Sequence, residues 1–583
     1  MAGKLEKPLT ALVITVVIGA ALFLSRRSSE RDAPPAADTA ATDAAPTRGG
    51  ELVTSVRAEP SAYNRHVDRS AAAEVLRLLT QAALVHVDRT TDTLEPWLAE
   101  SWTEAPDHLA YTLKLRPGIA FSDGVPLTSA DVLFSFRALY DPTVNSVLAG
   151  DVLVGGKPLT FEAPDPATVI VRFPAAFAGG LRLIDDIPIL PRYKLEAALT
   201  AGKFREAWSM KTPLTDIAGL GPFVLAEHLP GQRLVFTRNP HYWRKDAAGV
   251  ALPYLDKLTA LVASQPTEAL KMQSGEIDLM ANADIRPEDY SAFKRAADQG
   301  RLRLIDAGLG LDPSLLWFNL SPAHADDPRN AWLRQKAFRQ AVSCLVDRQA
   351  IVNTVYLGEA VPIFGPITPG NRTWFTDVRP ACEHDVTKAR ALFASAGLAD
   401  RNGDGILDDP SGQPAKFSIL TQAENIRARV VAVLQEQLRQ AGVVVDVVPL
   451  DQNALFEHFV QGNYDTIYFG LQASATDPAL NPQLWLSSGD WHFWNPGQKT
   501  PATDWERQID ELMGRVATTF DIAERKQLFA DVLRILADEL PGIYFVTPRV
   551  TLAISSRVAN PQPASQLPQL LWSADTLAAA RAR

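Results

Sequence analysis

Residues 94–142 read LEPWLAESWTEAPDHLAYTLKLRPGIAFSDGVPLTSADVLFSFRALYDP and carry more pattern than any other window of this 583-residue chain. Tyr111 to Leu115 alternates apolar and polar side chains, which predicts a strand. The Pro and Gly residues of Arg116–Gly118 and Ser122–Gly124 predict turns. Thr128 predicts the N-cap of a helix that ends before Pro142. The window therefore predicts a strand, two turns and a helix, in that order.

The same window resembles the motif string of extracytoplasmic solute-binding proteins of family 5, which serve peptide and nickel ABC transporters. The matching residues occur in one order, as LAESW (98–102), YT (111–112), LRPG (115–118), FSDG (121–124), PLT (126–128) and DV (131–132). Trp97, just before the first of these matches, and Trp102, its last residue, are interpreted as packing groups. So many matches in the same order strongly favour a genuine resemblance to this family over a chance one.

Further matches lie downstream of that window. Residues 219–243, GLGPFVLAEHLPGQRLVFTRNPHYW, predict two strands, Phe223 to Glu227 and Arg233 to Thr237, around a Pro-Gly hairpin. They resemble the family's "GTGPY … RNP-x-YW", with Leu220 in place of Thr. Shorter matches are SGEID (274–278), WFNL (317–320) and GPITPG (365–370).

The fold class expected is α/β. A helix from Glu424 to Ala441 followed by a strand from Val443 to Val448 indicates it directly. The resemblance implies more, namely a periplasmic-binding-protein-like fold of two lobes with an additional third domain. The expected boundaries are 51–93, 220–306 and 546–575 for the first lobe, 94–219 for the extra domain and 307–545 for the second lobe.

The N-terminus predicts export. Residues 9–24, LTALVITVVIGAALFL, are apolar and lie between Lys7 and Arg26. At 16 residues, this run suits an uncleaved membrane anchor or a cleaved signal, and the anchor within 1–27 is favoured. No cysteine lies directly after this apolar run, which argues against a lipoprotein. Residues 28–50 are rich in Ala, Pro, Thr and Asp, and predict a disordered spacer. The expected location is the periplasm or cell envelope, tethered to the inner membrane.

Composition excludes several classes of protein. A net charge of −10 with no long basic run argues against a nucleic-acid partner. No His-Glu-x-x-His, Gly-x-Ser-x-Gly or P-loop motif occurs, so neither a catalytic residue nor a cofactor is expected. Asp400 to Asp409 resembles half a calcium loop, but Ser411 replaces its twelfth-position Glu, so no metal site is assigned. Cys344 and Cys382 are equally compatible with a disulfide and with two free thiols.

The loop GLQASATDPALNPQLWLSSGDWHFWNP, residues 470–496, is the candidate binding segment. It gathers aromatic residues without helical or strand periodicity, as in loops that line an apolar cleft. The competing interpretation is that these rings only plug a domain surface. In peptide-binding members of the family an aspartate here pairs with the peptide's amino terminus, and Asp477 is the best positional match. The ligand-binding residues predicted are Asp477, Trp485, Trp491 and Trp494.

The resemblance implies a monomeric binding protein that captures peptides between its lobes and delivers them to the permease subunits of an ABC transporter. One alternative is a non-peptide solute, such as a metal chelate or an oligosaccharide. A second is a membrane-tethered sensor or scaffold without transport. A third is an envelope hydrolase, which the lack of a catalytic motif disfavours.

Overall fold

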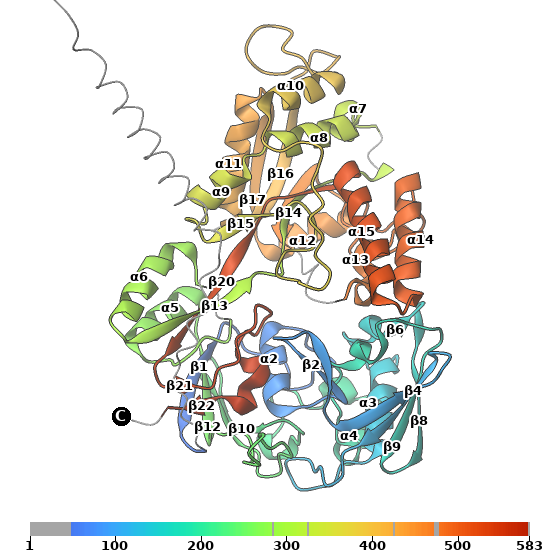
Figure 1. The fold of residues 1–583 in the computed structure, drawn as a ribbon, viewed down its shortest axis with the longest axis vertical. Helices are drawn as coiled ribbons and strands as arrows, with labels where there is room; N and C mark the ends of the chain where they lie inside the picture. Colours follow the sequence, from blue (N-terminus) through green and yellow to red (C-terminus); the bar gives the residue numbers. More distant parts are fainter. Residues whose placement is uncertain (1–47, 283–284, 323–325, 424–425, 471–476, 581–583) are drawn as a thin grey trace, which may run out of the picture. The chain divides into compact units, whose positions relative to one another are not determined.

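The computed structural model describes residues 48–282, 285–322, 326–423, 426–470 and 477–580 (Figure 1). The predicted anchor within 1–27 and nearly all of the predicted spacer lie outside these ranges. Among the residues described, no helix is both long enough and apolar enough to cross a membrane.

A four-stranded sheet in the order β1-β12-β11-β10 begins the folded part. Its strands are β1 (Glu51–Val56), β12 (Lys257–Val262), β11 (Arg233–Arg238) and β10 (Phe223–Leu229). β1 pairs with β12 in parallel and the other neighbours are antiparallel, so the hairpin predicted around Pro230 is present. Helix α2 (Ala71–Thr80) packs beside this sheet, and the Ser70 hydroxyl caps it by accepting the Ala73 N–H. Helices α5 (Gln265–Ser274) and α6 (Pro287–Asp298) follow.

A second four-stranded sheet, β4-β5-β9-β8, lies within residues 99–172 and is antiparallel throughout. Its strands are β4 (Ala99–Glu104), β5 (Ala110–Leu115), β9 (Thr168–Arg172) and β8 (Thr160–Asp165). Helix α3 (Ser129–Tyr140) packs on it, with Phe136 stacked on Phe161. The Asp131 carboxylate accepts the backbone N–H and the hydroxyl of Thr128, so the helix begins where the sequence predicts. Helix α4 (Arg192–Thr200) follows.

A five-stranded mixed sheet, β17-β16-β18-β14-β19, organises the C-terminal half. Its strands are β17 (Val444–Leu450), β16 (Lys416–Gln422), β18 (Thr466–Gly470), β14 (Ser314–Phe318) and β19 (Gly542–Tyr544). Side chains alternate along β14, so Leu316 and Phe318 join one core and Leu315 and Trp317 join another. The sheet is therefore covered on both faces, as in α/β proteins.

Separate groups of helices cover the two faces of that sheet. On the first face lie α8 (Lys336–Leu345), α9 (Arg348–Thr354), α10 (Val386–Ser395) and α11 (Ile426–Gln440). On the second lie α12 (Gln452–Gln461), α13 (Pro482–Trp485), α14 (Asp504–Thr518) and α15 (Ile522–Glu539). The Asp347 side chain caps α9 by accepting the Ala350 N–H.

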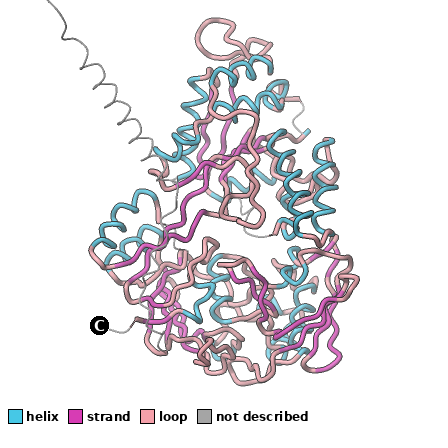
Figure 2. The backbone as a smooth tube through the Cα atoms, in the orientation of Figure 1, coloured by secondary structure: helices cyan, strands magenta, loops and turns pink. Residues whose placement is uncertain are grey.

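A three-stranded sheet joins the two halves of the fold. β20 (Val546–Ser555) pairs with β13 (Leu302–Leu309) near one end and with β15 (Ala360–Pro362) near the other. Figure 2 shows these strands, in magenta, running between the helices of the two halves. The predicted domain limits at 306 and 546 fall on this connection, and the limits themselves stay a prediction. Smaller pairs are β2 (Val85–Asp88) with β3 (Thr93–Pro96), β6 (Leu153–Val154) with β7 (Lys157–Pro158), and β21 (Val558–Ala559) with β22 (Ala578–Ala579).

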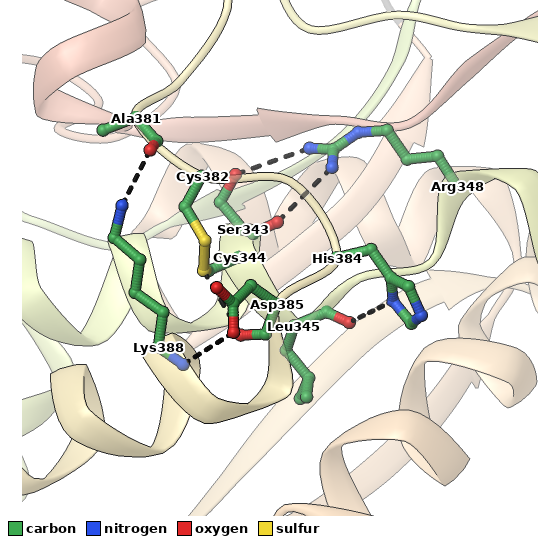
Figure 3. Close-up of a disulfide and its surroundings, with 9 residues drawn as sticks. All are labelled: Ser343, Cys344, Leu345, Arg348, Ala381, Cys382, His384, Asp385 and Lys388. Atoms are coloured by element: carbon green, nitrogen blue, oxygen red, sulfur yellow. Dashed lines mark hydrogen bonds between the residues drawn. A yellow bond between two sulfur atoms is a disulfide. The ribbon is translucent and has the colours of Figure 1, made fainter.

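A disulfide joins Cys344 on α8 to Cys382, just before α10 (Figure 3). Of the two alternatives that the sequence leaves open, the structure has the bonded one. The Asp385 side chain caps α10 by accepting the Lys388 N–H, and the Asp385 N–H donates to the Cys344 carbonyl. The bond therefore attaches the irregular segment 363–385 to the helical layer.

Candidate functional site

A cavity of about 340 Å³ opens between two groups of residues that are far apart in the sequence. The N-terminal wall consists of Asp92, Leu94, Trp102, Glu104, Tyr111 and residues 178–182. The C-terminal wall consists of Thr373, Trp374, Asp477, Ile522 and Arg525. The volume lies within the range of small-molecule sites, about 300 to 1,000 Å³.

The antiparallel pair β4 and β5 positions the aromatic and acidic groups of the N-terminal wall. Trp102 faces Leu113 and Glu104 faces Tyr111 in the register of the pair. Side chains two residues apart lie on the same face of a strand, so Trp102 and Glu104 both reach the cavity. Gly180 has φ +51°, and a Cβ there would lie 2.9 Å from the Tyr111 hydroxyl. The backbone can approach Tyr111 this closely only because residue 180 is glycine.

The Tyr111 hydroxyl donates a 2.8 Å hydrogen bond to Glu104 Oε1. Burial, and then this contact with a carboxylate, raise the pKa of Tyr111 well above its ordinary value. The phenol therefore stays protonated and acts as a donor to Glu104 throughout the physiological pH range.

An ion pair fixes the remaining charged groups of the N-terminal wall. Arg182 Nη1 lies 2.9 Å from Asp92 Oδ1, and the same guanidinium also donates to the Asp92 carbonyl. The Thr373 hydroxyl of the C-terminal wall lies 3.5 Å from Asp92 Oδ2. Asp92 therefore links the two walls and also balances the positive charge of Arg182.

Arg525 organises the C-terminal wall. Its Nη2 donates to Asp477 Oδ1 at 2.7 Å, and its Nε donates to the Val516 carbonyl at 2.9 Å. The guanidinium lies over the Trp374 ring, 4.9 Å from the centroid. Asp477 Oδ1 also accepts the Ala479 N–H and so caps the short 3-10 helix Pro478–Leu480. One buried arginine thus holds three segments of the wall together.

The walls touch beside the cavity. The Ala178 N–H donates to the Ala517 carbonyl at 2.8 Å. The His108 ring stacks on Phe520, with centroids 3.7 Å apart and an interplanar angle of 17°. These contacts connect the β4–β5 turn and residue 178 to the end of α14 and the α14–α15 connection.

The four predicted ligand-binding residues occupy different environments. Asp477 lines the cavity. Trp485 is buried behind the C-terminal wall, edge-on to Phe529, which in turn packs edge-on against Trp374. Trp494 is buried too, and its indole N–H donates to Glu506. Trp491 is 43% exposed, stacked on Phe459 of α12. The roles of all four in ligand binding stay predictions, and among them only Asp477 is one of the cavity-lining residues given above.

Several cavity residues escape prediction from the sequence. Arg182, Trp374 and Arg525 lie outside the aromatic loop, and Trp102 was interpreted as a packing group. Glu104 is one of many surface-type carboxylates in the sequence. No local pattern distinguishes any of these residues, because the walls meet only in the folded chain.

The acidic turn at Asp400 binds its own backbone. Asp400 accepts the N–H groups of Gly403 and Gly405, and Asn402 and Asp404 accept those of residues two positions on. Across the described parts of the chain, no group of three or more His, Cys, Asp or Glu side chains could hold a metal ion.

Comparison with known proteins gives consistent results. The family model described as "Bacterial extracellular solute-binding proteins, family 5 Middle" matches residues 93–493. A probable ABC transporter-binding protein of Deinococcus radiodurans is 26% identical over 507 residues, covering 82% of this chain and 84% of that protein. The oligopeptide-binding protein AppA of Bacillus subtilis is 27% identical over 464 residues, covering 78% of each chain.

Solved structures show the same fold. The binding protein MelB of Agrobacterium fabrum C58, solved in complex with stachyose, superposes with a TM-score of 0.72 at 22% identity. The match covers 92% of this chain and 86% of that one. The expected α/β, multi-domain architecture is therefore confirmed.

Proposed function

Because the chain belongs to the bacterial extracellular solute-binding proteins of family 5, which supply ABC transporters with their solutes, we propose that its own solute is a short peptide. The peptide binds in the cavity between the N-terminal and C-terminal walls. The closed form then delivers it to the permease subunits in the membrane. A monomer, tethered to the inner membrane by residues 1–27, would suffice for this role.

The size of the cavity supports a small ligand. A volume of about 340 Å³ lies near the lower end of the range for small-molecule sites, about 300 to 1,000 Å³. That volume suits a solute the size of a di- or tripeptide. A long peptide would need the walls to separate.

Similarity to AppA, named an oligopeptide-binding protein, supports a peptide over other solutes. An oligosaccharide is the second candidate. It is favoured by the indole ring of Trp102, which lines the cavity and against which a sugar ring can pack.

Native mass spectrometry of the full chain, purified from the cell envelope without denaturation, tests the proposal. Co-purified short peptides of mixed sequence would support it. A single sugar or chelate mass would replace the peptide with that solute. An empty protein whose melting temperature does not shift with peptide pools would favour a sensor or scaffold instead.

Asp477 supplies a residue-level test. If its carboxylate contacts the ligand's amino terminus, Asp477→Ala weakens peptide binding more than about tenfold, the loss of a charged hydrogen bond. Because Arg525 would be left buried without its partner, calorimetry must be limited to temperatures at which the variant is folded. Asp490→Ala, at an exposed position nearby, is the control. Unchanged affinity in a folded Asp477 variant removes this residue from the site.

A further inference from the structure

We infer that the cavity selects ligands carrying a positive charge, and that Glu104 on the N-terminal wall binds the cationic group. This inference rests on the proposed function in that it uses the same cavity. It names a residue and a chemical class that neither the sequence motifs nor the comparisons assign. The class comprises ligands with a free amino group, whether a peptide amino terminus or a small amine.

The charges that line the cavity compensate one another except at one position. The lining holds three carboxylates and two guanidiniums. Arg182 pairs with Asp92 at 2.9 Å, and Arg525 pairs with Asp477 at 2.7 Å. Glu104 is the remaining carboxylate. No arginine or lysine in the described part of the chain lies within ion-pair distance of it, and the basic group nearest to it is the His108 imidazole.

The hydrogen bonds of Glu104 leave one oxygen available. Both the Tyr111 hydroxyl, at 2.8 Å, and His108 Nδ1, at 2.6 Å, contact Oε1. Oε2 accepts no hydrogen bond from any residue that the structure describes. The side chain is 36% exposed, against 9% for that of Asp477. A ligand can therefore contact Oε2 of Glu104 without displacing a protein partner.

Trp102 lies two residues before Glu104 on the same face of β4 and also lines the cavity. A cation bound at Glu104 lies within reach of the indole, whose face attracts positive charge. The combination of a carboxylate with an aromatic ring favours an ammonium or guanidinium group over a neutral sugar hydroxyl, because only the cation gains from both neighbours.

The C-terminal wall differs in this respect. The Asp477 carboxylate is largely buried and its charge is already compensated by Arg525, so binding a second cation there gains less. A ligand cation should therefore bind more favourably at Glu104 than at Asp477. Substituting each residue separately distinguishes the two positions.

Isothermal titration calorimetry on the full chain at pH 8 tests the inference with four probes: Ala-Ala, N-acetyl-Ala-Ala, putrescine and raffinose. We expect the free amines to bind at least about tenfold more tightly than the acetylated or neutral probes. Glu104→Gln keeps an acceptor for Tyr111 and removes only the charge. It should weaken binding of the amines by about tenfold to a hundredfold and leave the neutral probes unchanged. Glu100→Gln, exposed on the same strand and outside the lining, should bind as the unaltered protein does.

The outcomes separate this inference from the peptide proposal. Putrescine binding that depends on Glu104, without Ala-Ala binding, upholds the inference and overturns the peptide. Ala-Ala binding that Glu104→Gln leaves unchanged upholds the peptide and overturns the inference. Preference for raffinose, or no binding of any amine to the unaltered protein, overturns the inference as well.

Discussion

Glu506 is the most completely hydrogen-bonded carboxylate near the aromatic loop. Its Oε1 accepts from His492 Nε2 at 3.0 Å and from the Trp494 indole at 2.9 Å. Its Oε2 accepts the Ala502 and Thr503 N–H groups at 2.8 Å and the Thr503 hydroxyl at 2.9 Å. Burial alone raises the pKa of Glu506, but the hydrogen bonds from His492, Trp494 and Thr503 outweigh it and lower the pKa to about 2. The aromatic loop is therefore fixed to α14 through this carboxylate.

These contacts predict a pH dependence of stability. The pKa of Glu506 falls from 4.5 to about 2 on folding, so its contribution is complete above pH 4.5 and is lost as pH falls toward 2. We expect Glu506→Gln to be less stable than the unaltered protein at pH 7, with a difference that shrinks between pH 4.5 and 2. Urea denaturation across this range measures it. Glu511→Gln, exposed on the same helix, should show no such convergence, and a constant difference for Glu506→Gln would contradict the assignment.

Single residues also show how far sequence alone can reach. Thr128 as a helix N-cap and the hairpin around Pro230 are predicted correctly, because their roles depend on neighbours a few positions away. The loop of residues 470–496 predicts Asp477 as a ligand-binding residue, but it does not predict the partner Arg525, which lies 48 residues further along the chain. The sequence does not predict Glu104 as a site residue, because the residues that face it across the cavity lie beyond residue 370. Contacts of that separation leave no local pattern in one sequence.

At the scale of elements, the segment between β15 and α10 is unusual. It runs from 363 to 385 without a helix or strand, yet it supplies Thr373 and Trp374 to the cavity. Loops of this length within a compact domain are uncommon and are generally functional. Trp374 packs edge-on against Phe529 of α15, and the Cys344–Cys382 disulfide holds the far end. The wall thus depends on a loop that is anchored at its middle by Trp374 and near its C-terminal end by Cys382.

We expect removal of the disulfide to loosen that loop. Closing 38 residues with a cross-link stabilises a protein by about 4 kcal/mol in the chain-entropy treatment. Cys344→Ser with Cys382→Ser should lower the free energy of unfolding by about that amount and weaken ligand binding. Urea titrations with and without dithiothreitol measure the change. The reductant should destabilise the unaltered protein alone, and equal effects on both proteins would contradict the prediction.

At the scale of the whole protein, capture requires that the walls approach each other around the solute. The two halves are joined by β13 and β20, and they meet again at the cavity through His108, Phe520 and the Asp92–Thr373 contact. A further contact, Arg429 to Glu288 at 3.0 Å, joins α11 to α6. The sequence predicted a two-lobed fold through its resemblance to a family, but these closing contacts became evident only in the structure.

The stack of His108 on Phe520 then offers a test of closure that leaves the cavity lining intact, since neither ring lines it. Such a pair contributes about 0.5 to 1.5 kcal/mol to the form in which the walls touch. Apparent affinity falls in proportion to the population of that form, so Phe520→Ala should weaken ligand binding by about two- to twelvefold.

Calorimetry with the co-purified solute measures this weakening. Hydrogen exchange at residues 104–111 and 517–525 should also become faster in the variant. Phe456→Ala, which removes another exposed ring of the C-terminal half, is the matched control. If Phe520→Ala binds like that control, closure does not depend on this contact, and the cavity must be held by the Asp92–Thr373 side instead.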